Sequence, residues 1–268
     1  MESKGTVLLL FLITSFFAGF TPSSANLYVR QIPNNLIVSS NASKELFNVT
    51  SYKDCAMSWG EEDLIAFNYN STSKECFGYK FILKMKKGSG SETSYLLTSS
   101  SEDKCQGDVM ADLENRLECM SPFTMIRTKH SVACYYMMKK EEYTQYEDIN
   151  QWDYVAACRR SYSYSHAASI LSQEENDLIM KSFKPEMIDE LRGLKIGLRT
   201  HITVEWNDGS VYNFSLLVPT SQENMKFCYG KTCYHAMLYW NNKGEAFWRA
   251  ADIDQRELLC KYTMLDKL

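Results

Sequence analysis

The clearest periodic pattern of apolar and polar positions lies in the second half of the chain. Apolar side chains recur at helical spacing between residues 152 and 159, and Asn150 and Asp153 supply the N-cap and the negative charge of a helix start. Ser172 and Glu175 form a capping box for a second helix. Its inward-facing residues would be Leu178, Ile179 and Phe183, with Pro185 as the stop. The pattern therefore predicts two short helices.

After the second helix the period changes from helical to alternating. Turn residues at 207–209 and 241–244 separate some of these segments. Short strands are expected at residues 194–198, 204–206, 234–240, 246–248 and 258–262. Two helices followed only by short strands predict an α+β domain with antiparallel sheets.

The first half of the chain has a less regular pattern. Residues 87–103 are rich in Gly, Ser and Thr, which predicts a hairpin or loop region. Cys119 then opens a segment with a different cysteine spacing. We place a domain boundary near residue 115, which gives an N-terminal module at 26–114 and a C-terminal domain at 115–265.

The first 25 residues have the pattern of a signal peptide. Lys4 precedes an apolar run from Val7 to Phe20, and small residues follow at Ser23 and Ala25, which suits cleavage before Asn26. A membrane anchor is the rival interpretation, but the run is shorter than the ~20 residues that cross a bilayer. We expect an extracellular, secreted protein without a membrane anchor.

Cysteine usage and sequons agree with secretion. The nine cysteines show no Cys-x-x-Cys spacing, and in an oxidising compartment they would form disulfides. Because nine is odd, one thiol is left free or pairs with another chain. Asn-x-Ser/Thr sequons, which predict surface glycosylation, occur at Asn41, Asn48, Asn70 and Asn213.

Charge and motifs exclude two functional classes. The net charge is -4 with no basic stripe, so nucleic acid is not an expected partner. The four histidines are scattered, with no His-Glu-x-x-His helix and no Gly-x-Ser-x-Gly elbow. We therefore expect no catalytic residues and no enzyme activity.

The C-terminal half of the chain, from about Cys119 to Tyr262, resembles a C-type lectin-like domain. The segments that carry the resemblance are Cys134–Tyr136, Trp152–Cys158, His166–Asn176, Lys195–Leu198 and Trp206–Ser210. The resemblance implies a fold with two helices, antiparallel sheets and a long loop region. It also implies recognition of an extracellular glycan or protein, with innate immune recognition as a setting.

The resemblance also implies disulfide bridges. Cys158 would pair with Cys260, and Cys119 with Cys134. The first cysteine of the family's third bridge aligns with Cys233, but the expected partner after Trp248 is missing, and a local Cys228–Cys233 bridge is the natural substitute. A zinc site formed by Cys228, Cys233 and His235 is the weaker alternative, because it lacks a fourth ligand.

Calcium binding is not expected at the family's usual site. The proline of its first ligand triplet aligns with Pro219, whose neighbours Val218 and Thr220 offer no carboxylate or amide. The second triplet aligns with Trp248–Ala250, which would place the cation of Arg249 at the ion position. We expect no metal or cofactor. Candidate ligand-binding residues are Glu223, Asn224, Tyr239, Trp240, Asn241 and Asn242, although strand aromatics are more often cross-strand partners.

The N-terminal module loosely resembles a PAN-like domain around Cys55–Trp59 and Leu64–Cys76. The resemblance implies a small α+β module with a Cys55–Cys76 bridge, and Cys76–Cys105 is the alternative. Cys105 is then the unpaired candidate, able to link two chains covalently. An extracellular structural or matrix protein, cross-linked through this cysteine, is the alternative function.

Overall fold

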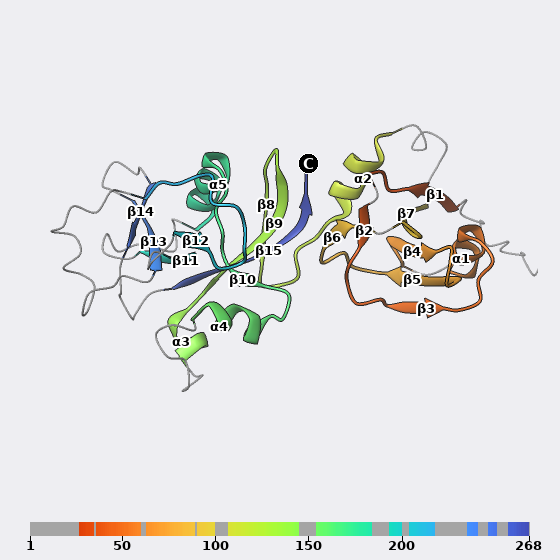
Figure 1. Ribbon diagram of the computed structural model, residues 1–268, viewed down its shortest axis with the longest axis horizontal. Coiled ribbons are helices and arrows are strands. Elements are labelled where there is room, and N and C mark those ends of the chain that lie inside the picture. Colours follow the sequence, from red (N-terminus) through yellow and green to blue (C-terminus); the bar gives the residue numbers. More distant parts are fainter. Residues whose placement is uncertain are drawn as a thin grey trace, which may run out of the picture.

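The protein forms two lobes joined by a short helix (Figure 1). The computed structural model describes residues 27–34, 36–59, 63–88, 90–99, 107–144, 154–183, 193–199, 204–217, 235–240, 246–250 and 257–267. We call residues 27–99 the N-terminal lobe and residues 119–267 the C-terminal lobe. No helix in the described part is long and apolar enough to span a bilayer.

The N-terminal lobe is built on a five-stranded antiparallel sheet. Its strands, in spatial order, are β1 (Leu27–Gln31), β7 (Glu92–Ser99), β4 (Ala66–Asn70), β5 (Glu75–Tyr79) and β3 (Lys44–Leu46). A separate pair, β2 (Leu36–Val38) and β6 (Met85–Lys87), is also antiparallel. This sheet architecture is that of an α+β module.

The prediction of a hairpin or loop over residues 87–103 is wrong in its centre. Strand β7 lies there, between β1 and β4, and it buries Ser94, Leu96 and Thr98. The strand does not pair with β6, so the segment is not a hairpin. Ser94 suits this strand because its hydroxyl donates a buried hydrogen bond to Asn68, which compensates for its burial.

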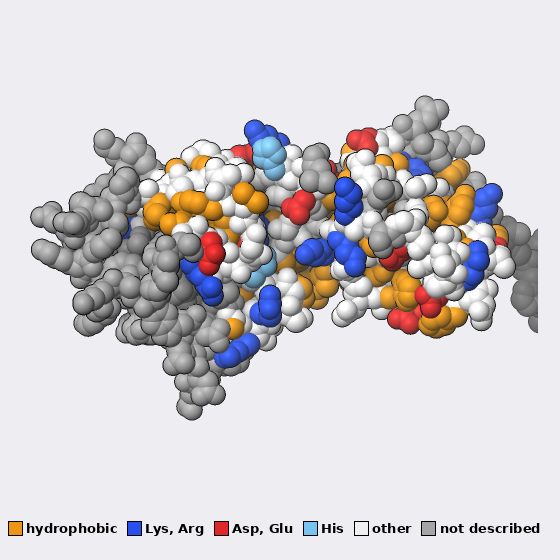
Figure 2. Space-filling model, viewed as in Figure 1, with side chains coloured by type: hydrophobic (Ala, Val, Ile, Leu, Met, Phe, Trp, Pro, Cys, Tyr) orange, Lys and Arg blue, Asp and Glu red, His pale blue; other side chains and the backbone are white. Residues whose placement is uncertain are grey.

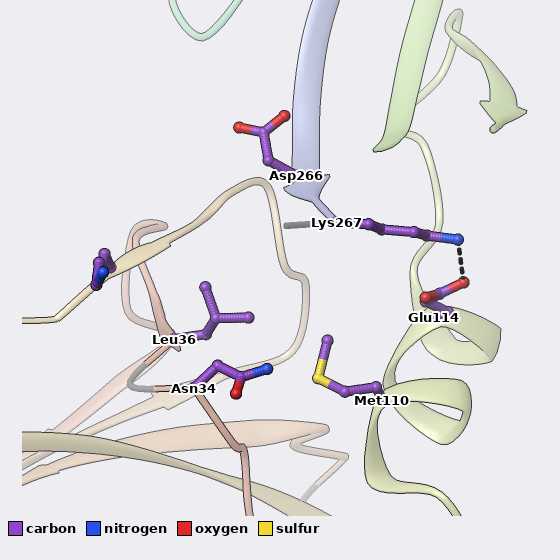
Figure 3. A pocket seen from close by; sticks show the side chains of 7 residues that line it. Asn34, Leu36, Met110, Glu114, Asp266 and Lys267 are labelled. Carbon is purple, nitrogen blue, oxygen red and sulfur yellow. Dashed lines mark ion pairs between the residues drawn. The ribbon is translucent and has the colours of Figure 1, made fainter. Parts of the chain in front are cut away.

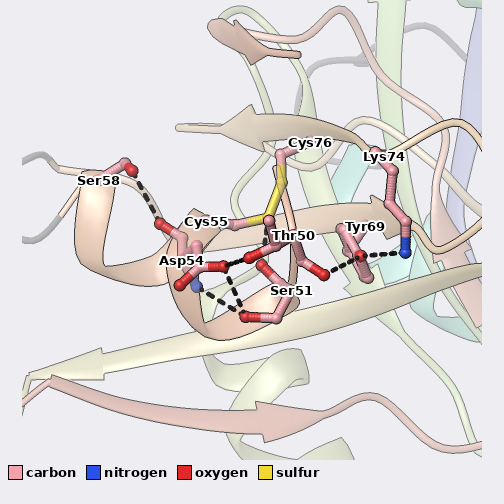
Figure 4. The surroundings of a disulfide bond; sticks show 8 residues. All are labelled: Thr50, Ser51, Asp54, Cys55, Ser58, Tyr69, Lys74 and Cys76. Atoms are coloured by element: carbon pink, nitrogen blue, oxygen red, sulfur yellow. Dashed lines mark hydrogen bonds between the residues drawn. A yellow bond between two sulfur atoms is a disulfide. The ribbon is translucent and has the colours of Figure 1, made fainter. Parts of the chain in front are cut away.

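Helix α1 (Tyr52–Ser58) covers one face of this sheet and is tied to it by a disulfide (Figure 4). Ser51 is the N-cap, and its hydroxyl oxygen accepts a bond from the Asp54 amide at 3.3 Å. Cys55, buried on the helix, bridges to Cys76 of β5. The side chains packed around the bridge include Trp59 and Phe67, in an edge-to-face contact.

Helix α2 (Val109–Arg116) joins the lobes because both of them hold it. From the N-terminal lobe, Arg30 pairs with Asp112, and Arg116 of the helix donates to the Leu97 carbonyl. From the C-terminal lobe, Arg127 donates to the Glu114 carbonyl at 3.1 Å, and Lys267 forms an ion pair with the Glu114 carboxylate at 2.7 Å.

A cavity of about 530 Å³ lies beside α2, with Leu36 and Met110 facing each other across it (Figure 3). The Lys267–Glu114 ion pair closes one side of this cavity. Asp266 points away from that pair. The lobes also share one buried apolar cluster, which includes Leu96, Leu113 and Leu258. The junction is therefore packed rather than a flexible linker.

The C-terminal lobe is built on a larger, mixed sheet. Its main order is β14 (Ala246–Ala250), β13 (His235–Trp240), β11 (Leu194–Arg199), β15 (Leu258–Asp266), β9 (Ser131–Met138) and β8 (Thr124–Arg127), with β10 (His166–Ala167) and β12 (Glu205–Trp206) at its sides. All pairs are antiparallel except β11 with β15. The strands predicted at 194–198, 234–240, 246–248 and 258–262 are present over the residues that the structure describes. Burial does not alternate along β13 and β15, where consecutive side chains such as Ala236, Met237 and Leu238 are all buried.

The predicted strand at 204–206 shortens to two residues. Trp206 is buried, whereas Val204 is exposed, so the expected alternation fails there. The turn after it forms as predicted, with Gly209 at a positive φ of 79°. Gly197 on the neighbouring strand permits a close approach, since a Cβ there would lie 2.5 Å from the Ala167 carbonyl oxygen.

Two helices cover the large sheet, and α3 (Lys140–Thr144) follows β9. Both predicted helices are present, as α4 (Tyr154–Ser161) and α5 (Gln173–Phe183). The capping residues proposed at 150–153, and Pro185, lie outside the described residues. Ser172 caps α5 by accepting from the Glu175 amide at 3.1 Å.

The inward face of α5 differs from the predicted one. Ile179 and Phe183 are buried and Leu178 is half-buried, but Glu175 and Asn176 are buried as well. The Glu175 carboxylate does not bond the Ser172 amide, as an ideal capping box would. It accepts instead from the Leu171 amide at 2.6 Å.

Two disulfides staple the C-terminal lobe in the pairs that the resemblance implied. Cys158 of α4 is joined to Cys260 of the central strand β15, across 102 residues. Cys119 is joined to Cys134 of β9. Beside them Phe123 and Tyr262 pack edge to face at 5.0 Å, and so do Tyr164 and Tyr262 at 4.9 Å. The bridges and rings fix α4 and residues 162–165 against the sheet.

Candidate functional site

A polar cleft of about 870 Å³ opens between the two lobes, and we call it the inter-lobe cleft. The N-terminal lobe contributes residues 39–41, 83 and 84, and the C-terminal lobe contributes α4, residues 163–166, the turn at 207–210 and the end of β15. Figure 2 shows Lys and Arg side chains gathered where the lobes meet. The side chains lining the cleft are mostly hydroxyls, amides and charged groups, with two tyrosines among them.

One wall of the cleft is formed by polar side chains that contact one another in series. The Ser169 hydroxyl donates to the Asp208 carboxylate at 2.6 Å, and the same carboxylate oxygen lies 3.5 Å from Nδ1 of His166. The other Asp208 oxygen accepts from the Ser210 amide at 3.0 Å, which fixes the turn. Because β10 and the 207–210 turn both border β11, residues far apart in sequence meet here.

Burial and charge shift the pKa of two groups in this wall. Burial opposes ionisation of Asp208, but the hydrogen bond from Ser169, the nearby His166 and the Ser210 amide hold its pKa below 3.8. Burial lowers the pKa of His166, and the cations of Lys261 and Lys84 act in the same direction, while Ala167 and Asp208 oppose them. The imidazole is therefore neutral near pH 7.

A buried ion pair supports this wall from beneath. Lys261 Nζ lies 2.7 Å from the Glu175 carboxylate and donates to the Ser169 carbonyl at 2.9 Å. Tyr135 also donates to Glu175, and the charge of Glu175 together with burial raises the Tyr135 pKa. Both charges are almost fully buried, so their mutual bonds compensate for desolvation. The network holds β15, β9, α5 and the Ser169 segment together.

Asn207, also in the cleft lining, has unused hydrogen-bonding capacity. Its side-chain nitrogen and oxygen are buried, and neither has a hydrogen-bond partner among the residues that the structure describes. An unsatisfied buried amide is unfavourable by about 1–3 kcal/mol per group. A ligand or an ordered water in the cleft would complete its bonding.

The wall is not arranged as a catalytic relay. A nucleophilic serine needs an adjacent base to take its proton, yet Ser169 donates to Asp208 rather than to His166. His166 directs Nδ1 towards the Ala167 carbonyl oxygen at 3.0 Å and towards Asp208. No described group of three His, Cys, Asp or Glu side chains could hold a metal ion. The arrangement suits hydrogen bonding to a ligand.

Most of the ligand-binding residues predicted from the sequence cannot be compared with the structure. Glu223, Asn224, Asn241 and Asn242 lie outside the described residues, and so does the side chain of Trp240. Tyr239 lies on β13 and stacks on its cross-strand partner Phe247, with ring centroids 5.8 Å apart. Its position is that of a cross-strand partner.

The positions aligned with calcium ligands are partly visible. Trp248 is fully buried, and its indole N–H donates to Asn176 at 3.2 Å. Arg249 follows it on β14, half-buried. Pro219 and the cysteines Cys105, Cys228 and Cys233 lie outside the described residues, so the local bridge and the free thiol stay predictions.

The four sequons differ in their surroundings. Asn41, Asn48 and Asn213 are exposed, as an acceptor of sugar must be. Asn70 is half-buried, and its side-chain oxygen accepts from the Thr72 amide at 2.9 Å. Asn41 lines the inter-lobe cleft, so a sugar attached there would stand at its edge.

No pattern in the sequence indicated the inter-lobe cleft. His166 opens a segment that carries the family resemblance and is otherwise one of four scattered histidines, and Lys261 lies in an apolar strand. A lysine inside a segment as apolar as 258–265 was the one available signal, since a charge there needs a buried partner. The partner, Glu175, could not be chosen from sequence spacing because 86 residues separate the two.

Comparisons with known proteins return similar solved structures only. No family model matches the chain, and no curated protein matches it. Human lithostathine is 20% identical over 54% of this chain and 99% of that chain, with a TM-score of 0.40. The mouse scavenger receptor C-type lectin carbohydrate-recognition domain is 20% identical over 55% of this chain and 100% of its own, with a TM-score of 0.38. The C-type lectin CEL-I from Cucumaria echinata is 17% identical over 54% and 96%, also with a TM-score of 0.38.

The structure itself defines the fold class. The C-terminal lobe has the C-type lectin-like α+β fold that the sequence predicts. Helix α4 is tied to the last strand, β15, by Cys158–Cys260, and Cys119–Cys134 joins the segment before β8 to β9, the partner of β8 in a hairpin. The N-terminal lobe is a small α+β module, and its likeness to a PAN-like domain stays a prediction.

Proposed function

We propose that this chain is a secreted recognition protein that binds a glycan in the inter-lobe cleft, without calcium and without catalysis. The signal peptide and the sequons at exposed asparagines support an extracellular setting. Pathogen recognition is one such setting.

The lining of the cleft is the observation that carries this proposal. Sugars present hydroxyls, which bond to amides, hydroxyls and charged groups, and apolar ring faces, which pack on aromatic rings. The cleft offers both kinds of partner. Ser163, Asn207 and Asp208 provide polar groups, and Tyr164 and Tyr262 provide rings.

The proposed independence from calcium has a separate basis. Calcium sites combine several oxygen ligands, carboxylates above all, around one ion. The aligned position holds the cation of Arg249, and the Asp208 carboxylate is occupied by Ser169 and the Ser210 amide. Hydrogen bonds and ring packing would therefore carry the affinity.

A glycan array, run with calcium and again with a chelator, tests the proposal on the full secreted chain. Binding should be equal in the two conditions. Ser163→Trp, which fills the cleft from an exposed position, should abolish it. Ser182→Trp, at an exposed position on α5 outside the cleft, is the matched control. Loss of binding with the chelator, or no glycan bound at all, would contradict the proposal.

The odd number of cysteines favours a second function, that of a covalently linked matrix protein. Non-reducing electrophoresis of the secreted chain separates the two. A disulfide-linked dimer that Cys105→Ser converts to monomer would support the matrix function, whereas a monomer that binds glycan would support recognition.

A further inference from the structure

The charges around the inter-lobe cleft are unequal. Its lining includes four cationic side chains, and the only carboxylates among its described residues are Asp208 and Asp266. Three cations matter for a ligand: Lys84 from the N-terminal lobe, and Arg159 and Arg199 from the C-terminal lobe. The fourth, Lys261, is neutralised by Glu175.

The side chains of Lys84, Arg159 and Arg199 are available to a ligand. Lys84 and Arg159 are exposed, and neither has an ion-pair partner among the described residues. Arg199 has only a long contact of 3.9 Å with Glu205. Of the acids, Asp208 is already satisfied within the wall. An unpaired arginine or lysine is a strong partner for carboxylate or sulfate oxygens.

The two lobes present these cations across one opening. Lys84 lies near enough to His166 to depress its pKa, although the two residues belong to different lobes. On the face drawn in Figure 2, Lys and Arg side chains continue from the junction of the lobes to the region of α4. A chain-like anion lying along the cleft would meet cations from both lobes.

We propose that the glycan bound in the inter-lobe cleft is acidic, bearing sulfate or carboxylate groups that pair with Lys84 and Arg159. This inference rests on the proposed function and names its ligand class. Asn207, with its buried and unpaired amide, would supply a hydrogen bond to the same ligand after a small rotation towards the cleft. The charge contacts would make binding weaker at high salt.

Retention of the full chain on immobilised heparin, a sulfated and uronate-rich polymer, tests this ligand class. Wild-type protein should be retained at low salt, and Lys84→Gln/Arg159→Gln should bind about tenfold more weakly or worse. Lys53→Gln/Lys181→Gln removes the same charge from exposed positions outside the cleft, and should change binding by less than about twofold. Thermal unfolding checks that both pairs are folded.

Competition identifies the acidic group. Release by dextran sulfate or by polygalacturonate would support the inference and would distinguish sulfate from carboxylate. Equal release by neutral dextran, equal weakening by the two variant pairs, or no retention of wild type would overturn it. If wild type binds neutral glycans on the array in a manner that Ser163→Trp abolishes, yet ignores heparin, the acidic ligand class fails while the proposed function survives.

Discussion

Each lobe buries a polar side chain against its sheet, and the two lobes compensate for this burial with different partners. In the N-terminal lobe the buried group is a neutral amide, that of Asn68. Asn68 donates to the Val38 carbonyl at 2.8 Å and to Glu92 at 2.8 Å, and accepts from Ser94. In the C-terminal lobe the centre is the ion pair of Lys261 and Glu175.

The two centres differ in the cost of losing one hydrogen-bonding or ionic partner. A buried amide that loses one partner leaves a dipole unsatisfied, whereas a buried ion pair that loses one partner leaves a whole charge without compensation. The C-terminal centre also positions Ser169, and through it Asp208 and His166. The charged centre therefore lies beneath the cleft and holds its wall in place.

Removal of the long disulfide should have the largest effect on stability. In the chain-entropy model, loss of Cys158–Cys260, with its separation of 102 residues, reduces the free energy of unfolding by about 4.7 kcal/mol. Loss of Cys55–Cys76, with a separation of 21, should cost about 3 kcal/mol. Urea unfolding of the two Cys→Ala double variants compares them, and an equal loss would count against the loop-length explanation.

Breaking the ion pair should have the next largest effect. Lys261→Met leaves Glu175 charged and buried, which should destabilise the protein by about 3–5 kcal/mol. Replacing both partners, as Lys261→Met/Glu175→Leu, should recover most of this loss. Chemical denaturation of the three proteins measures it. A double variant as unstable as the single one would show that packing, rather than the unpaired charge, dominates.

Asn68→Ala tests the neutral centre and should have a smaller effect, about 1–3 kcal/mol. The Val38 amide would keep one hydrogen bond in this variant, because it also donates to the Ser94 hydroxyl at 2.9 Å. Because Asn68 does not titrate, we expect the loss to be the same at pH 5 and pH 8. Denaturation at the two pH values checks this, and a marked pH dependence would contradict the assignment of a neutral centre.

The smallest expected effect is the pH dependence that His166 gives to the C-terminal lobe. Its pKa in the folded protein is below the ordinary 6.5, so the unfolded chain binds its proton first as the pH falls. Stability is therefore full above pH 6.5 and decreases below it, towards the lower folded pKa.

His166→Gln should flatten this part of the stability profile. Asp208→Asn should instead steepen it, because the Asp208 charge raises the His166 pKa and its loss lowers that pKa further. The stabilisation from Asp208 itself lies in a separate window, present above pH 3.8 and lost as the pH falls further. Thermal melts from pH 4.5 to 7.5 measure both variants. A slope below pH 6.5 that persists in His166→Gln would refute the role of this histidine.

Local features of the fold were predictable from sequence because local rules produce them. The spacing of apolar residues along α5, the alternation of Leu194, Ile196 and Leu198, and the glycine turn at 209 depend on neighbours within a few residues. Strand β7 was not predictable in this way, because its Ser and Thr residues become buried only when β1 and β4 pair with it.

The sequence alone determined the α+β class of the C-terminal domain. Through a family resemblance it also determined the pairs Cys158–Cys260 and Cys119–Cys134. The signal peptide that it predicts stays a prediction. Only the tertiary structure decided where the charges gather. Lys84, Arg159 and Arg199 come from segments that no sequence run connects, so the chain has no basic stripe although its cleft is lined by cations. Electrostatic interactions depend on distance in space, and folding sets that distance between residues remote in the chain.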